Sequence, residues 1–283
     1  MQGARVQAGG RMGVAGRALT LALVLALTAG AAPAPRPARI VSINPCVDAV
    51  LLRVADPRQI AAISHYSQDA RATSVPLALA RRFRATSGTA EEVVALAPDL
   101  VIVGGHVAPA TIAALRRLRI PLVQIGVPAS IAESNAQVAQ IAALAGHRDR
   151  GTRLIAQTQA ALARARGEGP PVSALIWQGG GLVPGQGTLA DDLLRATGFR
   201  NLSAAYGLQQ WDVLPLEYLV ARPPRVLLSP GAAAGEDRML GHPVLRRLAA
   251  RIAVRAYPAR LLNCGGPTII DAAVRLGTIR RSL

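Results

Sequence analysis

A short segment of this sequence occurs twice, and the repeat constrains the fold more than any other feature. Residues 91–105 and 217–231 align without a gap at an offset of 126 residues (217 − 91 = 126). Five of the fifteen aligned positions are identical, namely Glu91/Glu217, Val94/Val220, Ala95/Ala221, Pro98/Pro224 and Gly105/Gly231. Solenoid repeats recur about every 20–50 residues, so a repeat at this larger distance predicts two similar domains.

Each copy has the pattern of a short helix, a break and a buried strand. Thr89 with Glu92 three residues later forms a capping box that begins the helix, and Pro98 ends it. Residues 100–103 are continuously apolar, as in a strand covered on both faces. Residues 104–106, Gly-Gly-His, leave the carboxyl end of that strand, where open α/β sheets place their ligands.

Strands and helices alternate along the rest of the chain, which predicts parallel sheets covered by helices. Strands are expected at 39–43, 60–64, 100–103, 121–125, 172–176, 226–228 and 253–257, with helices at 46–54, 109–118, 188–198, 242–250 and 268–279. Between the two groups, one helix runs from the Ser130/Glu133 capping box to Ala145 and a second spans 148–166. At 1.5 Å per residue the second helix is about 28 Å long, a rod rather than a hinge.

The first 32 residues are predicted to be a cleaved secretory signal peptide. Arg11 and Arg17 supply a positive region, and Leu19 begins an apolar run of about ten residues, too short for a bilayer that needs about 20. Residues 29–31 form an A-x-A-type cleavage site, and Met12 is an alternative start. No Cys stands at that site, so we expect export to the periplasm without a lipid anchor.

The charge of the chain, +16, raises the question of a nucleic-acid partner. All 32 basic residues are Arg, they are scattered, and only 3% of the residues are aromatic, which leaves little for bases to stack on. Because the chain is also expected to be exported, we exclude a nucleic-acid function.

In several places the sequence resembles the class III periplasmic substrate-binding proteins, which feed cobalamin or ferric siderophores to ABC importers. The resemblance is carried by residues 39–42, 91–101, 118–123, the rod helix 148–166, and Trp211 six positions before Glu217. It implies an α/β fold of two α/β lobes with parallel sheets joined by one long rigid helix, and a ligand in the cleft between the lobes. It also implies a monomer whose partners are a small-molecule metal chelate and the permease dimer of the importer. The expected domains are the signal peptide (1–32), an N-terminal lobe (39–126), connecting helices (127–169) and a C-terminal lobe (170–283).

Loops that follow strands are expected to line the cleft. Aromatic and glycine residues there suit a large flat ligand, since rings supply contact area and glycine allows close approach. The expected ligand-binding residues are His65, Tyr66, His106, Trp177, Gln178, Trp211, Asn263 and Cys264. The resemblance implies corrin contacts for Trp177 and Trp211, although Trp177 would also suit a core position. Abundant Arg favours a ferric siderophore instead.

The histidines and cysteines of the chain allow further hypotheses about the same cleft. His65 and His106 would suit a bare metal ion or haem, but two histidines are few for a closed zinc site, so no metal site or resident cofactor is predicted. Cys46 and Cys264, the two cysteines of the chain, form either a disulfide or cleft thiols. A secreted enzyme with a Cys nucleophile is the rival class, but no catalytic motif accompanies it, and we expect no enzyme.

Glu91 and Glu217 occupy the same position in the two repeated helices. A carboxylate in a first helical turn is stabilised by the helix dipole. The resemblance implies more, because in that family a surface Glu on each lobe pairs with arginines of the permease. We therefore expect Glu91 and Glu217 to be the permease-docking residues.

Overall fold

The structure, a computed structural model, describes residues 36–233, 243 and 251–283. These residues belong to one compact unit, Arg36–Leu283. The predicted signal peptide and the predicted helix at 242–250, except for the single residue 243, lie outside the described residues.

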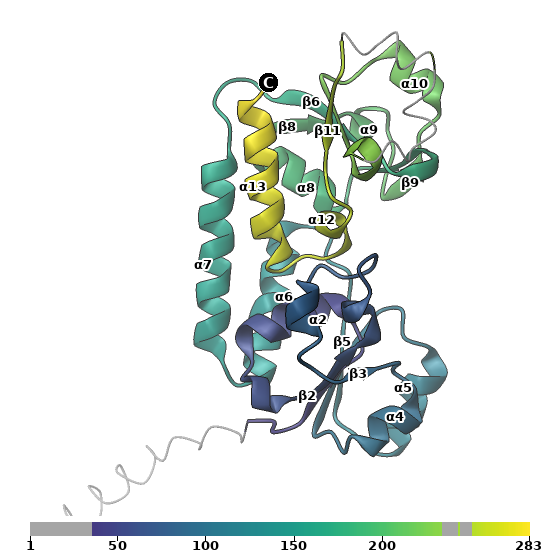
Figure 1. The fold of residues 1–283 in the computed structure, drawn as a ribbon, viewed down its shortest axis with the longest axis vertical. Coiled ribbons are helices and arrows are strands. Elements are labelled where there is room, and N and C mark those ends of the chain that lie inside the picture. Colours follow the sequence, from purple (N-terminus) through teal and green to yellow (C-terminus); the bar gives the residue numbers. More distant parts are fainter. Residues whose placement is uncertain (1–35, 234–242, 244–250) are drawn as a thin grey trace, which may run out of the picture. The chain divides into compact units, whose positions relative to one another are not determined.

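The first sheet has five parallel strands in the order β3-β2-β1-β4-β5 (Figure 1). Its strands are β1 (Ile40–Ser42), β2 (Ile60–Ser64), β3 (Ala85–Thr86), β4 (Leu100–Gly104) and β5 (Leu122–Ile125). The helices around it are α2 (Pro45–Val54), α3 (Leu77–Ala80), α4 (Ala90–Ala95) and α5 (Pro109–Arg117), with two short 3-10 turns, η2 (Pro57–Gln59) and η3 (His65–Gln68). Successive β4 residues enter two different cores, with Ile102 on one face and Val101 and Val103 on the other. The continuous apolar run therefore does mark a strand buried on both faces.

The second sheet has four parallel strands in the order β11-β10-β6-β8. Its strands are β6 (Val172–Ile176), β8 (Phe199–Asn201), β10 (Val226–Ser229) and β11 (Ala253–Ala256). Its helices are α8 (Leu189–Ala196), α9 (Leu202–Ala205), α10 (Leu216–Ala221), α12 (Arg260–Asn263) and α13 (Thr268–Arg281), with the 3-10 turns η4 (Gly179–Gly181) and η5 (Pro230–Ala233). A separate antiparallel pair, β7 (Leu182–Pro184) and β9 (Trp211–Val213), packs beside it.

The sequence repeat is a structural repeat. Helices α4 and α10 are each six residues long and begin at Ala90 and Leu216, an offset of 126 (216 − 90 = 126). Strands β4 and β10 begin at Leu100 and Val226, with the same offset. Each strand lies inside its sheet, between two parallel partners.

Helix α6 (Ile131–Leu144) and the rod α7 (Arg148–Ala165) connect the two groups of strands. The first half of α7 packs on the first core through Leu154, whereas its second half packs on α13 through Ala165. A Cβ atom on Gly277 of α13 would lie 2.9 Å from the Cα of Ala165, so glycine allows this close contact. Figure 1 shows α7 running alongside α6 and α13. The rod is thus packed against both lobes, as the two-lobed fold requires.

The predicted capping box of Thr89 and Glu92 is confirmed only in part. Thr89 Oγ1 accepts a hydrogen bond from the Glu92 amide (3.3 Å), as in a capping box. The Glu92 carboxylate, however, accepts from Thr86 Oγ1 (2.8 Å) and the Ser87 amide (2.7 Å), and these bonds lower its pKa.

Among the helices that the structure describes, none has the length and apolar character needed to span a membrane.

Candidate functional site

A cavity of about 680 Å³ opens at the carboxyl end of the first sheet. Residues 44–46 follow β1, and residues 104–106 start at the last residue of β4; both segments line the cavity. The chain adds β2 on one side of β1 and β4 on the other, so these two loops leave the point where the strand order reverses. Open α/β sheets bind ligands at this position.

Asn44 fixes the geometry at this switch point. Its Oδ1 accepts hydrogen bonds from the amides of Cys46 (2.8 Å) and Val47 (3.0 Å), which caps α2. A Cβ atom on Gly104 would lie 1.9 Å from Asn44 Nδ2. Glycine at position 104 therefore lets the end of β4 approach the cap, which brings the two cavity loops together.

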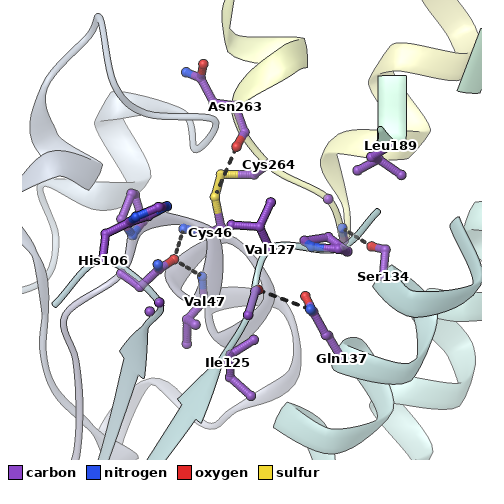
Figure 2. A pocket seen from close by; sticks show the side chains of 18 of the residues that line it. Cys46, Val47, His106, Ile125, Val127, Ser134, Gln137, Leu189, Asn263 and Cys264 are labelled. Carbon is purple, nitrogen blue, oxygen red and sulfur yellow. Dashed lines mark hydrogen bonds between the residues drawn. A yellow bond between two sulfur atoms is a disulfide. The ribbon is translucent and has the colours of Figure 1, made fainter. Parts of the chain in front are cut away.

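The opposite wall comes from the second group of strands and from α6. It consists of the start of α8 (187–190), Trp211 at the start of β9, and residues 261–266 at and after α12. From α6, Ser134 accepts a hydrogen bond from the Gly266 amide (2.7 Å), in a buried contact drawn in Figure 2. The cavity therefore lies between the two lobes.

The described cavity wall is mostly apolar, and its polar side chains carry no carboxylate or guanidinium. No Arg, Asp or Glu is among the described residues that line it, although the whole chain has a net charge of +16. Its polar side chains are carboxamides, hydroxyls and three rings, from Asn44, Gln137, Gln210, Asn263, Ser87, Thr89, Thr111, Ser134, Thr188, Tyr66, His106 and Trp211. The Arg-lined cleft considered from composition is thus not present in the described wall.

Cys46 and Cys264 form a disulfide that joins positions 218 residues apart. Both cysteines line the cavity, and Figure 2 shows the bridge running from the ribbon of α2 to the chain that follows α12. Of the two alternatives left open by the sequence, the structure has the disulfide.

Five of the eight predicted ligand-binding residues lie on the cavity wall, and three do not. Tyr66, His106, Trp211, Asn263 and Cys264 are on the wall. His65, Trp177 and Gln178 are not among the residues that line the cavity. The His65 ring turns toward β3, with its Nδ1 3.2 Å from the Thr86 carbonyl oxygen, and packs against the ring of Tyr66.

Trp177 is fully buried because the chain folds back over it. Its amide donates to the Leu228 carbonyl (2.8 Å), and its side chain joins the core of Val183 and Leu214. The turn that starts at Gln178 leads into β7, and the Gln178 amide donates to the Leu182 carbonyl (2.9 Å). The β7–β9 pair therefore covers the end of β6, and Trp211 of β9, 41% exposed, reaches the cavity instead.

Asp48 is a buried carboxyl that sequence reasoning missed. Its Oδ2 accepts from the Ser64 amide (2.9 Å) and the Ser67 hydroxyl (2.6 Å), whereas Oδ1 has no hydrogen-bond partner. Burial raises the pKa of Asp48 to about 7, against the lowering effect of these hydrogen bonds. Ser64 and Ser67 flank Tyr66, so Asp48 holds the turn that carries this cavity residue. The only sequence signal was an acidic residue in an otherwise apolar helix turn.

The wall offers two side chains that would coordinate the metal of a bound chelate, the phenol of Tyr66 and the imidazole of His106. Within residues 36–233, 243 and 251–283, no three or more His, Cys, Asp or Glu side chains are grouped closely enough to hold a metal ion. His65 and His106, paired in the bare-metal hypothesis, are not both on the wall.

The predicted docking residues Glu91 and Glu217 are exposed, each the second residue of its helix, α4 or α10. Neither carboxylate makes a hydrogen bond or an ion pair with another described residue, in contrast to the neighbouring Glu92.

The sequence and the fold of this chain are similar to those of known periplasmic binding proteins. The sequence model of a family described as periplasmic binding protein matches residues 40–257. Among solved structures, the chain is similar to the periplasmic heme-binding protein RhuT from Roseiflexus sp. RS-1 (24% identity, 86% of this chain and 98% of that chain covered, TM-score 0.67). It is also similar to the periplasmic heme binding protein HutB of Vibrio cholerae (20%, 85% and 98%, 0.70). A third similar structure is the periplasmic vitamin B12 binding protein BtuF of Vibrio cholerae (16%, 88% and 99%, 0.66). A search of curated proteins found no match.

Proposed function

The chain belongs to the periplasmic binding protein family, and on this premise we propose that it captures a corrinoid in the cavity between its lobes and delivers it to an ABC importer. Members of this family are the substrate-binding components of transport systems. The observation that carries the choice of ligand is the lack of Arg, Asp and Glu among the described residues that line the cavity, together with the carboxamide side chains there.

The candidate chelates differ in their charge, and the described cavity wall suits some of these charges better than others. A ligand that enters the cavity loses part of its hydration, and an anionic group then needs a cationic partner to offset that loss. Ferric siderophores of the catecholate and carboxylate types are anionic, and haem carries propionates. A corrinoid presents neutral amides around its ring, and the carboxamides of Asn44, Gln137, Gln210 and Asn263 would exchange hydrogen bonds with them. The described wall thus fits a neutral amide-rich ligand best.

The aromatic side chains on the wall support a flat ligand. Tyr66 is 51% exposed and Trp211 is 41% exposed, and they come from opposite lobes. Exposed rings in a cavity supply a large contact area with few rotatable bonds. A macrocycle held between the lobes would cover both.

Haem is the second candidate, favoured by a different observation. Tyr66 and His106 both reach the wall, and phenolate and imidazole are both axial ligands of haem iron. Similar solved structures include proteins named for heme binding as well as one named for vitamin B12.

Calorimetric titration of the purified protein with cyanocobalamin, hemin and one anionic ferric catecholate separates these ligands. We expect cyanocobalamin to bind with a dissociation constant of about 1 μM or less, and at least about tenfold more tightly than the other two. Tighter binding of hemin would overturn the corrinoid assignment in favour of haem.

For delivery, we propose that Glu91 and Glu217 dock a monomer of this protein on the permease dimer. The support is geometric, since α4 and α10 are equivalent helices of the two lobes and both carboxylates are exposed. A pair of anionic positions would suit a two-fold partner with cationic loops, and salt would weaken the contact.

We further propose that residues 1–32 direct export, so that the protein acts in the periplasm, and that it is not an enzyme. Both cysteines of the sequence are in the disulfide, so neither is available as the thiolate that a Cys nucleophile requires.

A further inference from the structure

We propose that the Cys46–Cys264 disulfide is a redox-sensitive latch that holds the two lobes together across the binding cavity and slows the release of bound ligand. The proposal rests on the proposed function for the identity of the ligand, but the latch itself concerns the two lobes. Its basis is the place of the bridge in the fold.

The bridge joins two separately built cores. Cys46 is the second residue of α2, a helix that packs into the first core through Val50 and Val54. Cys264 directly follows α12, which packs into the second core through Leu261. A movement that separates the lobes at this point would therefore have to break a covalent bond or distort one of the helices.

Two other polar contacts of this region are exposed to water. We call residues 260–266 the latch segment. Its Arg260 carbonyl accepts from the Ser74 hydroxyl (2.7 Å), and its Asn263 side chain donates to the Ala72 carbonyl (3.2 Å). Both hydrogen bonds are exposed, so water competes for their donors and acceptors. Without the disulfide, such bonds would resist opening only weakly.

The latch segment also lies directly on the first lobe. A Cβ atom on Gly266 would be 2.6 Å from Cγ2 of Val50 in α2, and the backbone at Gly266 has a positive φ of 60°. Its amide donates to the buried Ser134 hydroxyl of α6. Hydrogen exchange of the Gly266 amide would therefore report whether the segment leaves the first lobe.

The cavity controls access to the bridge. Both cysteines line it, with Cys264 6% exposed and Cys46 half-buried, so an attacking thiolate reaches the sulfur atoms from the cavity. A ligand in the cavity would shield the bridge. This shielding would slow the reduction of the bridge. If reduction also weakens ligand binding, linkage requires that bound ligand makes reduction less favourable at equilibrium by the same free energy.

The redox step needs a dithiol as the reductant. A thiolate of the dithiol attacks one sulfur atom and forms a mixed disulfide, and its second thiolate displaces the protein thiol. Two electrons and two protons pass in total, so Cys46 and Cys264 become thiols and the dithiol becomes a disulfide. A Cys46 thiolate would lie in the first turn of α2, where the helix dipole stabilises negative charge.

The test compares the oxidised protein, the protein reduced with dithiothreitol, and the C46S/C264S variant. Hydrogen exchange of the peptide that contains Gly266 is measured without ligand, and the dissociation rate is measured with cyanocobalamin. We expect exchange to be faster in the reduced protein and in the variant, and dissociation to accelerate about tenfold in both, a typical size for coupled sites. Dithiothreitol should not change the variant, and saturating cyanocobalamin should slow reduction of the oxidised protein.

Each outcome decides between the two proposals. Unchanged exchange and dissociation on reduction would overturn the latch, and so would faster exchange with an unchanged dissociation rate. Faster exchange in a protein that binds no cyanocobalamin in any state would support the link between the lobes and overturn the corrinoid assignment. If C46S/C264S does not fold, the reduced protein carries the test, because its sequence is unchanged.

Discussion

Replacing Trp211 by alanine should weaken ligand binding by an amount that follows from its exposure. A tryptophan side chain presents up to about 250 Å². Trp211 is 41% exposed, which leaves about 100 Å² for a ligand to cover. At about 25 cal/mol per Å², full coverage stabilises the complex by about 2.5 kcal/mol and half coverage by about 1.3 kcal/mol. We therefore expect the dissociation constant for cyanocobalamin to rise about 10- to 70-fold.

The assay is isothermal titration calorimetry with two matched variants. Trp211→Phe keeps an aromatic face and should lose less than half of this free energy. Val213→Ala changes a 57% exposed side chain on the same strand that is not on the cavity wall, so it should leave the dissociation constant unchanged. An unchanged constant for Trp211→Ala, or an equal loss in Val213→Ala, would refute the assignment of Trp211 to the ligand.

Three further predictions test other parts of the account. Gly104→Ala should destabilise the protein by about 1–3 kcal/mol, because the added Cβ atom would overlap the side chain of Asn44. Thermal unfolding measures this loss. The control is Gly105→Ala, which should be tolerated because a Cβ atom there would have no other atom within 4 Å. Because the pKa of Asp48 is raised from 3.8 to about 7, the folded state retains a proton that the unfolded state has released, so the free energy of unfolding should fall by about 4 kcal/mol as pH rises from about 4 to 7. Urea unfolding at several pH values should show this decrease in the free energy of unfolding for the wild type but not for Asp48→Asn. The same decrease in both proteins would mean that another group causes it. Glu91→Arg with Glu217→Arg should abolish ligand uptake by cells and leave ligand affinity intact. Uptake at the wild-type rate would contradict the docking role of these two residues.

Local sequence signals predicted most of the fold. The apolar runs at β4 and β10, the proline breaks and the 126-residue offset are properties of neighbouring residues, and they located the two sheets and their helices. The rod was found for the same reason, since its apolar stripe needs only helical periodicity. Short elements such as β3 (Ala85–Thr86) were missed because two residues carry no periodic pattern.

The site was predicted less completely, because a cavity wall depends on what covers each strand end. Trp177 follows β6 as His106 follows β4, yet the antiparallel pair β7–β9 buries Trp177, whereas His106 lies on the wall. That pair joins residues about 30 positions apart, which no local pattern encodes. The sequence did not indicate that the described part of the wall lacks arginine, because the position of each arginine relative to the cavity depends on the whole fold.

The ligand of this protein can be identified from the absorption spectrum of the protein purified from the periplasm of its native host. We expect the protein to carry a corrinoid, seen as the corrin bands of a bound cobalt chelate at up to one per chain. The Soret band of haem, or the charge-transfer band of a ferric siderophore, would contradict this expectation.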